Sequence, residues 1–389
     1  MLWKHYIFFR GNRVHDLWDQ LFLNRPIRLL YIAGRGFDIR VINVLTEFLD
    51  NIKSSSHSLE RAKLLLIHLD EYEYSDELNN LTSETADELN NRFKEIGQVQ
   101  EVKLGGTLSD GDNLSPSNKI KSGVEDILSN LTDETDIILD VSSLPRVVYL
   151  TLITSILAKL VPDKKVDNPL FAKGVNFQVL VAEDAALDSK IKSEELNPDV
   201  VFIPGFSAAL HAEYMQKWPL VWFPVLGEHR LTQFDKVISI IPNDAEICPV
   251  VPHPSDDPRR ADRLLIEYRV PLFEIQQIPT SNILYVHERN PFEAYRQLLM
   301  AMERYRNSLK ILDGCRLVVT PLASKLITIG VGLACFEMKP TKKEENYGIA
   351  IPYAEPRRYT ASIVELKSTR PEIASLLLTG NAYGTNNDQ

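Results

Sequence analysis

The feature that most constrains the fold of this chain is a repeating alternation of secondary-structure signals. Short runs of apolar and β-branched residues are followed by loops of Gly, Pro, Ser and charged residues, and then by stretches with helical periodicity, from end to end. Strands that alternate with helices in this way form mainly parallel sheets that are covered by helices. The sequence therefore predicts an α/β protein.

The strand signals fall into two series that are separated by a polar stretch over residues 185–197. After an expected strand within residues 1–10, the first series covers residues 27–33, 63–69, 136–140 and 177–181. The second covers residues 200–203, 220–223, 247–251, 283–286, 317–319 and 348–351. We predict two Rossmann-like halves, residues 1–190 and 191–389, with a single continuous sheet as the alternative. No close internal repeat is visible, so a duplication is suggested by pattern alone.

The charge balance limits the kinds of molecule that the protein can bind, and the cysteine content indicates its cellular compartment. Lys and Arg number 43 against 53 Asp and Glu, and the net charge of −10 opposes direct binding to nucleic acid or to anionic lipid. The three cysteines form no C-x-x-C pair, which favours a reducing cytoplasm. The first ten residues lack a signal-peptide pattern, and the longest apolar stretches are too short or interrupted, so we expect no membrane span. Dispersed histidines predict no zinc site.

Ligands of open parallel sheets bind beyond the carboxyl ends of the strands, so the loops that follow strands are the candidate sites. Between the strand over residues 27–33 and the next helix lie Gly34, Arg35, Gly36, Asp38 and Arg40. Glycines there let backbone N–H groups approach a phosphate at a helix terminus. The loop lacks the third glycine of G-x-G-x-x-G and the G-K-[ST] ending of a P-loop. The alternative is a tight turn with Asp38 as the helix cap.

A second loop of the first half has the same arrangement. The strand over residues 136–140 ends at Asp140 and is followed by Ser142, Ser143 and Arg146. Two hydroxyls and an arginine at a helix start can hold an anion, and Asp140 can hold ribose hydroxyls, bind a metal or act as a base. The alternative is a serine cap with a surface arginine.

In the second half, three loops combine acidic and basic side chains. One strand is followed by Glu228, His229 and Arg230. These residues can supply an acid/base pair and an anion clamp, and the alternative is an ordinary polar loop. Arg259 and Arg260 follow the next, and because cations at a helix start oppose the dipole, each needs an anionic partner, either a protein carboxylate or a ligand phosphate. Glu288 follows a third strand as a catalytic carboxylate or as the partner of these arginines.

The turn Pro321-Leu322-Ala323-Ser324-Lys325 enters an apolar helix that contains Gly330 and Gly332. A lone lysine at the start of such a helix is well placed to meet an anion, and we predict Ser324 and Lys325 as ligand contacts. The two glycines more simply allow close helix packing. Over about twenty residues, this turn resembles the ligand-proximal turn of nucleotide-sensing Rossmann-like domains associated with prokaryotic immunity. The resemblance implies a nucleotide ligand.

Together these loops predict a cleft in which Arg35, Arg146, Arg259, Arg260 and Lys325 converge on a nucleotide or another phosphorylated small molecule. The first hypothesis is a sensing or regulatory module without turnover. The second is a nucleotide-processing enzyme that acts by glycosidic cleavage or phosphoryl transfer, with Asp38, Asp140, Glu228 or Glu288 as acid, base or metal ligand. The third is a scaffold subunit, and the apolar helix is compatible with a homo-oligomer or a partner protein. No cofactor is indicated.

Overall fold

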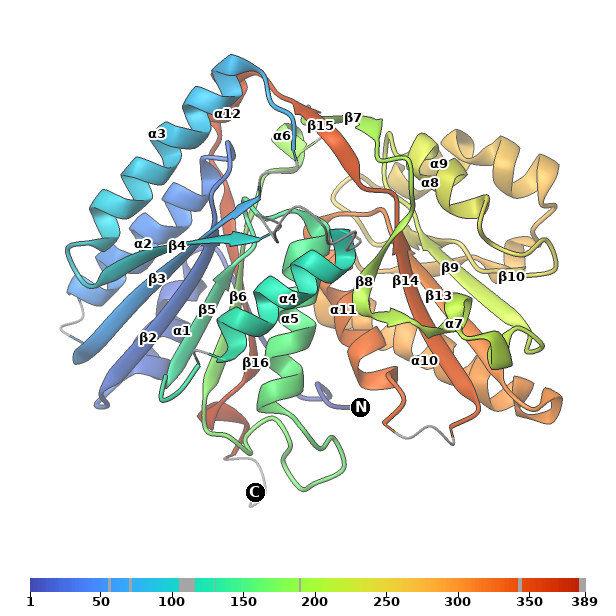
Figure 1. The fold of residues 1–389 in the computed structure, drawn as a ribbon, viewed down its shortest axis with the longest axis horizontal. Helices are drawn as coiled ribbons and strands as arrows, with labels where there is room; N and C mark the ends of the chain where they lie inside the picture. The colour runs from blue at the N-terminus through green and yellow to red at the C-terminus, as the bar shows by residue number, and fades with distance from the viewer. Residues whose placement is uncertain are drawn as a thin grey trace, which may run out of the picture. The chain divides into compact units, whose positions relative to one another are not determined.

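The computed structural model divides the chain into two compact units, each with its own sheet (Figure 1). It describes residues 1–54, 57–69, 72–104, 116–129, 131–188, 190–341 and 345–384. The outer unit comprises residues 2–195 and 356–389, and the inserted unit comprises residues 196–355 together with Met1. The two mainly parallel sheets confirm the predicted α/β class with two Rossmann-like halves, and the alternative of one continuous sheet is wrong.

Seven strands form the sheet of the outer unit in the order β1-β16-β6-β5-β2-β3-β4. The strands are β1 (Ile7–Arg10), β2 (Ile27–Gly34), β3 (Leu59–Leu69), β4 (Gln98–Leu104), β5 (Asp136–Asp140), β6 (Asn176–Glu183) and β16 (Glu372–Thr379). Strands β2 to β6 are parallel, whereas β16 is antiparallel to β6 and β1 is antiparallel to β16. The chain leaves β2 for β3 on one side and β5 for β6 on the other, so the strand order reverses between β2 and β5.

Helices cover both faces of this sheet (Figure 1). They are α1 (Arg13–Phe22), α2 (Arg40–Ser54), α3 (Asp76–Phe93), α4 (Pro116–Ser129), α5 (Arg146–Leu160), α6 (Ala185–Asp188) and α12 (Ile363–Ser368). Apolar residues at helical spacing on α1, α2 and α3 pack against alternate residues of β2 and β3, and Trp18 meets the ring of Phe48 edge to face at 5.3 Å. Figure 1 shows α4 and α5 on the opposite side of the sheet.

The inserted unit has a sheet of the same strand order. Its strands are β8 (Val201–Ser207), β9 (Leu220–Val225), β10 (Glu246–Ile247), β11 (Val250–Pro252), β12 (Leu284–Val286), β13 (Cys315–Pro321) and β14 (Tyr347–Tyr353). They lie in the order β12-β11-β9-β13-β14-β8, and β10 pairs with β9. Only β8 among these strands is antiparallel to its neighbour. The order reverses between β9 and β13, as it does between β2 and β5.

The helices of the inserted unit are α7 (Ala208–His211), α8 (Leu231–Ile238), α9 (Arg260–Glu267), α10 (Pro291–Leu309) and α11 (Lys325–Met338). Short helical turns occur at η1 (Glu213–Met215), η2 (Val270–Ile275), η3 (Thr280–Asn282) and η4 (Lys310–Leu312), with η5 (Asn381–Tyr383) in the outer unit. A Cβ atom on Gly330 of α11 would overlap the carbonyl oxygen of Pro291 on α10. Gly330 therefore allows these two helices to pack closely.

The observed units differ from the predicted ranges at the carboxyl end of the chain. Residues 356–389 return to the outer unit, where β16 pairs with both β1 and β6. At the two points along the sequence where one unit ends and the other begins, β7 (Lys192–Leu196) and β15 (Pro356–Thr360) pair to form a small two-stranded sheet. Local periodicity does not indicate which sheet a strand joins, because that choice is made by long-range pairing. Among the described helices, none combines the length and apolar character needed to cross a membrane.

The cysteine thiols provide a first testable prediction. Cys248, Cys315 and Cys335 are buried and form no disulfide. Burial raises the pKa of Cys248 and of Cys315 to about 11, and it also raises the pKa of Cys335. At pH 8 only about one in a thousand of the first two thiols is ionised. We expect negligible reaction of the native chain with a disulfide reagent and full reaction after unfolding in guanidinium; rapid labelling before unfolding would contradict the described burial.

Candidate functional site

The two candidate loops of the outer unit meet where the strand order reverses. The hydroxyl of Ser143, in the loop after β5, donates to the carbonyl oxygen of Gly34, at the end of β2, over 2.8 Å. A Cβ atom on Gly34 would lie 2.8 Å from the Leu144 side chain, and one on Gly36 would lie 3.1 Å from the carbonyl oxygen of Ser143. The loops approach closely at these two glycines, where a Cβ atom would require the neighbouring groups to shift.

Asp140 and Ser142 are occupied within the fold. The carboxylate of Asp140 is fully buried and accepts from the Tyr31 hydroxyl at 3.2 Å and from the Ser142 N–H at 2.9 Å. Burial, reinforced by Asp140, raises the pKa of Tyr31 well above its ordinary value. The Ser142 hydroxyl accepts from the Ala182 N–H at 3.0 Å. These contacts give Asp140 and Ser142 structural roles, and the predicted roles of Asp140 as a base or ribose ligand and of Ser142 as an anion contact remain predictions.

Asp38 and Arg40 form a buried ion pair at the start of α2. Arg40 is 1% exposed, and its Nη2 and Nε lie 2.6 Å and 2.9 Å from the two carboxylate oxygens of Asp38, while Asp188 is 2.8 Å away. Burial alone would lower the pKa of Arg40, but the paired carboxylates raise it above its ordinary value, so the side chain remains charged. Asp38 also accepts from the Arg40 N–H at 3.2 Å. Asp38 thus positions Arg40, and its predicted catalytic role remains a prediction.

The segment from Arg35 to Arg40 contains buried donors that lack acceptors. Within the described residues, Arg35 Nε and Arg40 Nη1 are buried without a hydrogen-bond partner. The backbone N–H groups of Gly36 and Phe37, both buried residues, likewise donate to no described protein atom. Buried donors without acceptors are costly and uncommon in folded proteins. These donors are suited to an acceptor-rich anion.

Arg35 and Arg146 lie at the two ends of the contact between these loops. Arg35 forms an ion pair over 3.1 Å with Glu101 of β4, whose side chain is 51% exposed. Such an exposed pair contributes little stability and can yield to a ligand. Arg146 is the first residue of α5 and is half-buried directly after the Ser143 loop.

In the inserted unit the strand order reverses between β9 and β13, and the loops after these two strands are closely packed. A Cβ atom on Gly227 would overlap the carbonyl oxygen of Leu322, and the Tyr268 hydroxyl donates to the Gly227 carbonyl at 2.8 Å. Ser324 caps α11 by accepting from the Ile327 N–H at 3.5 Å, which is a structural role. Lys325 is half-buried at the first position of α11. The predicted ligand contacts of Ser324 and Lys325 remain predictions.

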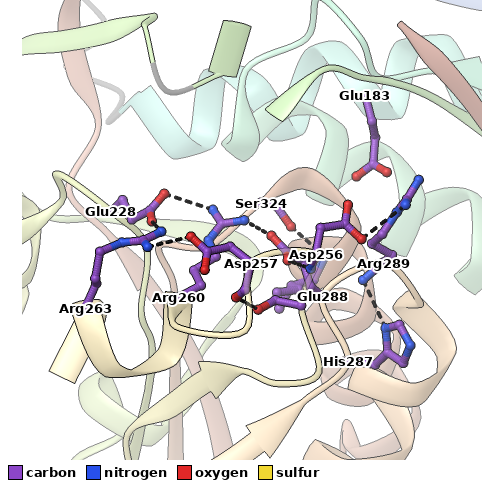
Figure 2. A network of polar contacts seen from close by, with 12 residues as sticks. Glu183, Glu228, Asp256, Asp257, Arg260, Arg263, His287, Glu288, Arg289 and Ser324 are labelled. Atoms are coloured by element: carbon purple, nitrogen blue, oxygen red, sulfur yellow. Dashed lines mark hydrogen bonds and ion pairs between the residues drawn. The ribbon is translucent and has the colours of Figure 1, made fainter. Parts of the chain in front are cut away.

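In the inserted unit the arginines are paired with carboxylates. Figure 2 shows Arg260 between Glu228 and Glu288; it forms an ion pair with each of them, at 3.1 Å with Glu228. Glu228 also lies 3.5 Å from Arg263, and Glu288 accepts from the Asp256 N–H at 3.2 Å. The anionic partner expected for Arg260 is therefore protein carboxylate. The predicted roles of Glu228 and Glu288 as acid or base remain predictions.

The remaining candidates of the inserted unit do not form a common cluster with that pair. Arg259 is exposed at the start of α9, and its N–H bonds to Asp257 at 2.9 Å. Arg230 is half-buried just before α8, and His229 is exposed with its N–H bonded to Glu267 at 2.8 Å. Among the described residues, no group of three His, Cys, Asp or Glu side chains could hold a metal ion.

A separate cavity of about 470 Å³ lies at the opposite, amino-terminal edge of the outer sheet. Its lining includes Phe22, Arg25 and His57. Arg25 forms two hydrogen bonds with the buried carboxylate of Asp136, at 2.7 Å and 2.6 Å.

Sequence reasoning missed an aromatic cluster at the carboxyl edge of the outer sheet. The ring of Phe37 lies 5.4 Å from Tyr74 and 6.4 Å from Tyr359, and Tyr72 lies 6.4 Å from Tyr74 and 5.6 Å from Tyr359. Tyr72 and Tyr74 alternate with a polar residue, as in a strand, but this segment adjoins an acidic helix and reads as solvated surface. The sequence around Tyr359 does not indicate a place in the cluster, because this residue comes from a distant part of the chain.

No protein-family model matches this sequence, and the search of curated proteins found no match. Among solved structures, the chain aligns with a protein described as a universal stress protein from Pseudomonas aeruginosa UCBPP-PA14, at 12% identity and a TM-score of 0.23, over 85% of this chain and 94% of that one. It also aligns with UDP-GlcNAc 2-epimerase from Neisseria meningitidis bound to UDP-GlcNAc, at 10% identity and a TM-score of 0.22, over 82% and 93%. The Rossmann-like assignment of each unit rests instead on its own strand order.

Proposed function

We propose that the outer unit binds a nucleotide or another phosphorylated small molecule between the loops after β2 and β5, as a sensing or regulatory module. The observation that carries this proposal is the set of buried donors without acceptors, Arg35 Nε, Arg40 Nη1 and the N–H groups of Gly36 and Phe37. Phosphate has several acceptor oxygens and is bound by guanidinium groups and by backbone N–H groups near helix starts.

The start of helix α2 adds to the case for an anionic ligand. The 15-residue helix α2 begins at Arg40, and the positive end of its dipole lies at the loop. Arg35 adds a guanidinium group whose ion-pair partner, Glu101, is 51% exposed and can yield to a ligand.

Binding without turnover is favoured over the enzyme alternative by the state of the predicted acids and bases. Asp38 and Asp140 are buried and hydrogen-bonded, and Glu228 and Glu288 are engaged by Arg260. A general acid or base must reach the proton that it transfers. A panel of nucleotides and sugar phosphates, followed by thermal shift and by product formation, separates the hypotheses: binding alone supports the sensor, product supports the enzyme, and neither supports the scaffold.

The site itself is tested by Arg35→Ala. We expect its affinity for the phosphorylated ligand to fall about tenfold or more, because a hydrogen bond to a charged group is lost. The control is Arg28→Ala, since Arg28 pairs with Glu60 and Asp133 at the other end of β2 and should leave the affinity unchanged. Titration calorimetry measures both. An unchanged affinity in Arg35→Ala, with a loss in the Arg259→Ala and Arg260→Ala double variant, would move the site to the inserted unit.

A further inference from the structure

We infer that the inserted unit has a binding site of its own, in which Arg316 and Trp218 hold the carboxylate group of a small organic molecule. Arg316 is the second residue of β13, and Trp218 lies two residues before β9, the strand that pairs with β13. The site is thus at the amino ends of these strands, away from the loops that follow them. It does not depend on the proposed phosphate site, which belongs to the outer unit.

Arg316 is a buried arginine without a carboxylate partner among the described residues. It is 7% exposed, and its Nε donates to the carbonyl oxygen of Trp218 over 2.9 Å. Its two η nitrogens form no hydrogen bond or ion pair with the part of the chain that the structure describes. Burial lowers the pKa of Arg316; Asp244 opposes this shift but forms no ion pair with it. Buried arginines are normally paired, as Arg40 is, so this guanidinium group lacks an anionic partner.

The guanidinium group is already oriented for a ligand. The hydrogen bond from Nε to a backbone carbonyl restrains the plane of the group, while both η nitrogens keep their N–H groups available. Two such N–H groups side by side bind both oxygens of a carboxylate. A group that is ordered beforehand loses less conformational entropy on binding. Arg316 is therefore suited to a two-point contact with a carboxylate.

Trp218, the residue that holds Arg316, supplies a further donor. Its indole Nε1 is buried without a hydrogen-bond partner among the described residues. The indole lies against Gly314, two residues before Arg316, where an added Cβ atom would be 2.7 Å from Cε2, the ring carbon bonded to Nε1. The N–H of a buried tryptophan usually has an acceptor. A carboxylate supplies the acceptor that both side chains lack.

Tyr214 provides exposed aromatic surface next to Trp218. Its ring meets the indole edge to face, with centroids 5.9 Å apart and an interplanar angle of 88°, and the residue is 60% exposed. No other described ring packs on it. Small-molecule sites combine a few polar groups with apolar and aromatic surface. We therefore expect the carboxylate to belong to a molecule that also carries an apolar group.

Calorimetric titration of the full chain with three probes tests this site. The probes are 3-phenylpropionate, acetate and 3-phenylpropanamide, which is a neutral amide of the same size. We expect 3-phenylpropionate to bind about tenfold or more tightly than the amide, because hydrogen bonds to a charged group are lost in the amide. Equal affinities of these two probes, or no binding of either carboxylate at millimolar concentration, would overturn the proposal. Equal affinities of 3-phenylpropionate and acetate would overturn the role of Tyr214.

Substitutions assign the binding to Arg316. Arg316→Lys keeps the charge but removes the two-point contact, so the affinity for 3-phenylpropionate should fall about tenfold or more. Lys217→Met is the matched control, because Lys217 is an exposed cation directly before Trp218 and its loss should leave the affinity unchanged. Wild-type affinity in Arg316→Lys, with circular dichroism showing that it is folded, would overturn the proposal, as would equal losses in the two variants.

Two further variants keep the test decisive if Arg316→Lys does not fold. Trp218→Phe retains the carbonyl that holds Arg316 and removes the indole N–H, so the affinity for 3-phenylpropionate should fall about tenfold. Arg35→Ala changes the loop after β2 and should leave this affinity unchanged. Wild-type affinity in Trp218→Phe would overturn the role of the indole. Loss of binding in Arg35→Ala would place the probe in the outer unit and overturn the assignment to the inserted unit.

Discussion

Replacement of Asp136 by alanine is expected to lower the free energy of unfolding of the outer unit by about 3–5 kcal/mol, as in other buried ion pairs that lose one partner. Asp136 is fully buried at the start of β5, where it accepts from both terminal nitrogens of Arg25. It also accepts from Asn176 at 2.9 Å and from the Thr135 hydroxyl at 2.7 Å. The substitution leaves all three of these partners without their acceptor.

Urea unfolding combined with hydrogen exchange measures this loss, because exchange resolves the outer unit from the inserted one. Asp133→Ala is the matched control. Asp133 lies three residues earlier and pairs with Arg61 and Arg28, but its side chain is 50% exposed. Exposed pairs of this kind contribute little to stability, so no measurable change is expected. Equal effects of the two substitutions would contradict the burial of Asp136 and its hydrogen bonds to these three partners.

Gly227→Ala is expected to destabilise the inserted unit by about 3 kcal/mol or more, at the upper end of overpacking effects. The added Cβ would overlap the carbonyl oxygen of Leu322 and lie 3.2 Å from Cα of Ala323. Both contacts are with backbone, which cannot rotate away as a flexible side chain can. The loops after β9 and β13 would have to separate, and the Tyr268 hydrogen bond to the Gly227 carbonyl would be strained.

The control for this substitution lies two residues away in the same loop. His229 is exposed and has a φ of 59°, a conformation in which glycine is less strained than other residues. His229→Gly should therefore retain or increase the stability of the inserted unit. Hydrogen exchange of β9 and β13 measures both variants. Wild-type protection in Gly227→Ala would contradict the close packing of the two loops.

The fold class and the positions of the loops could be predicted because their signals are local. Apolar runs and helical periodicity are properties of neighbouring residues, and the carboxyl ends of parallel strands share one edge of a sheet. This reasoning identified Gly34 and Gly36, and the structure places both glycines where the loops approach closely. It also identified Gly330 as a helix-packing residue.

Pairing between distant side chains could not be predicted in the same way. Asp140 satisfies Tyr31 and Ser142, and Arg260 binds Glu228 and Glu288, so carboxylates that suggested catalysis serve the fold. Their burial and partners depend on which strands become neighbours, and no local pattern encodes that. For the same reason, the sequence could not predict that Tyr359 joins the aromatic cluster or that residues 356–389 return to the outer unit.

Local chemistry along the chain was thus enough to establish an α/β protein with glycine-rich and arginine-rich loops at strand ends. Only the folded chain decided which donors are left without acceptors, because hydrogen bonds and ion pairs join groups that long-range packing brings together. Among the described residues, that selection leaves one nitrogen each of Arg35 and Arg40 buried without an acceptor in the loop after β2, and it pairs Arg260 with two glutamates.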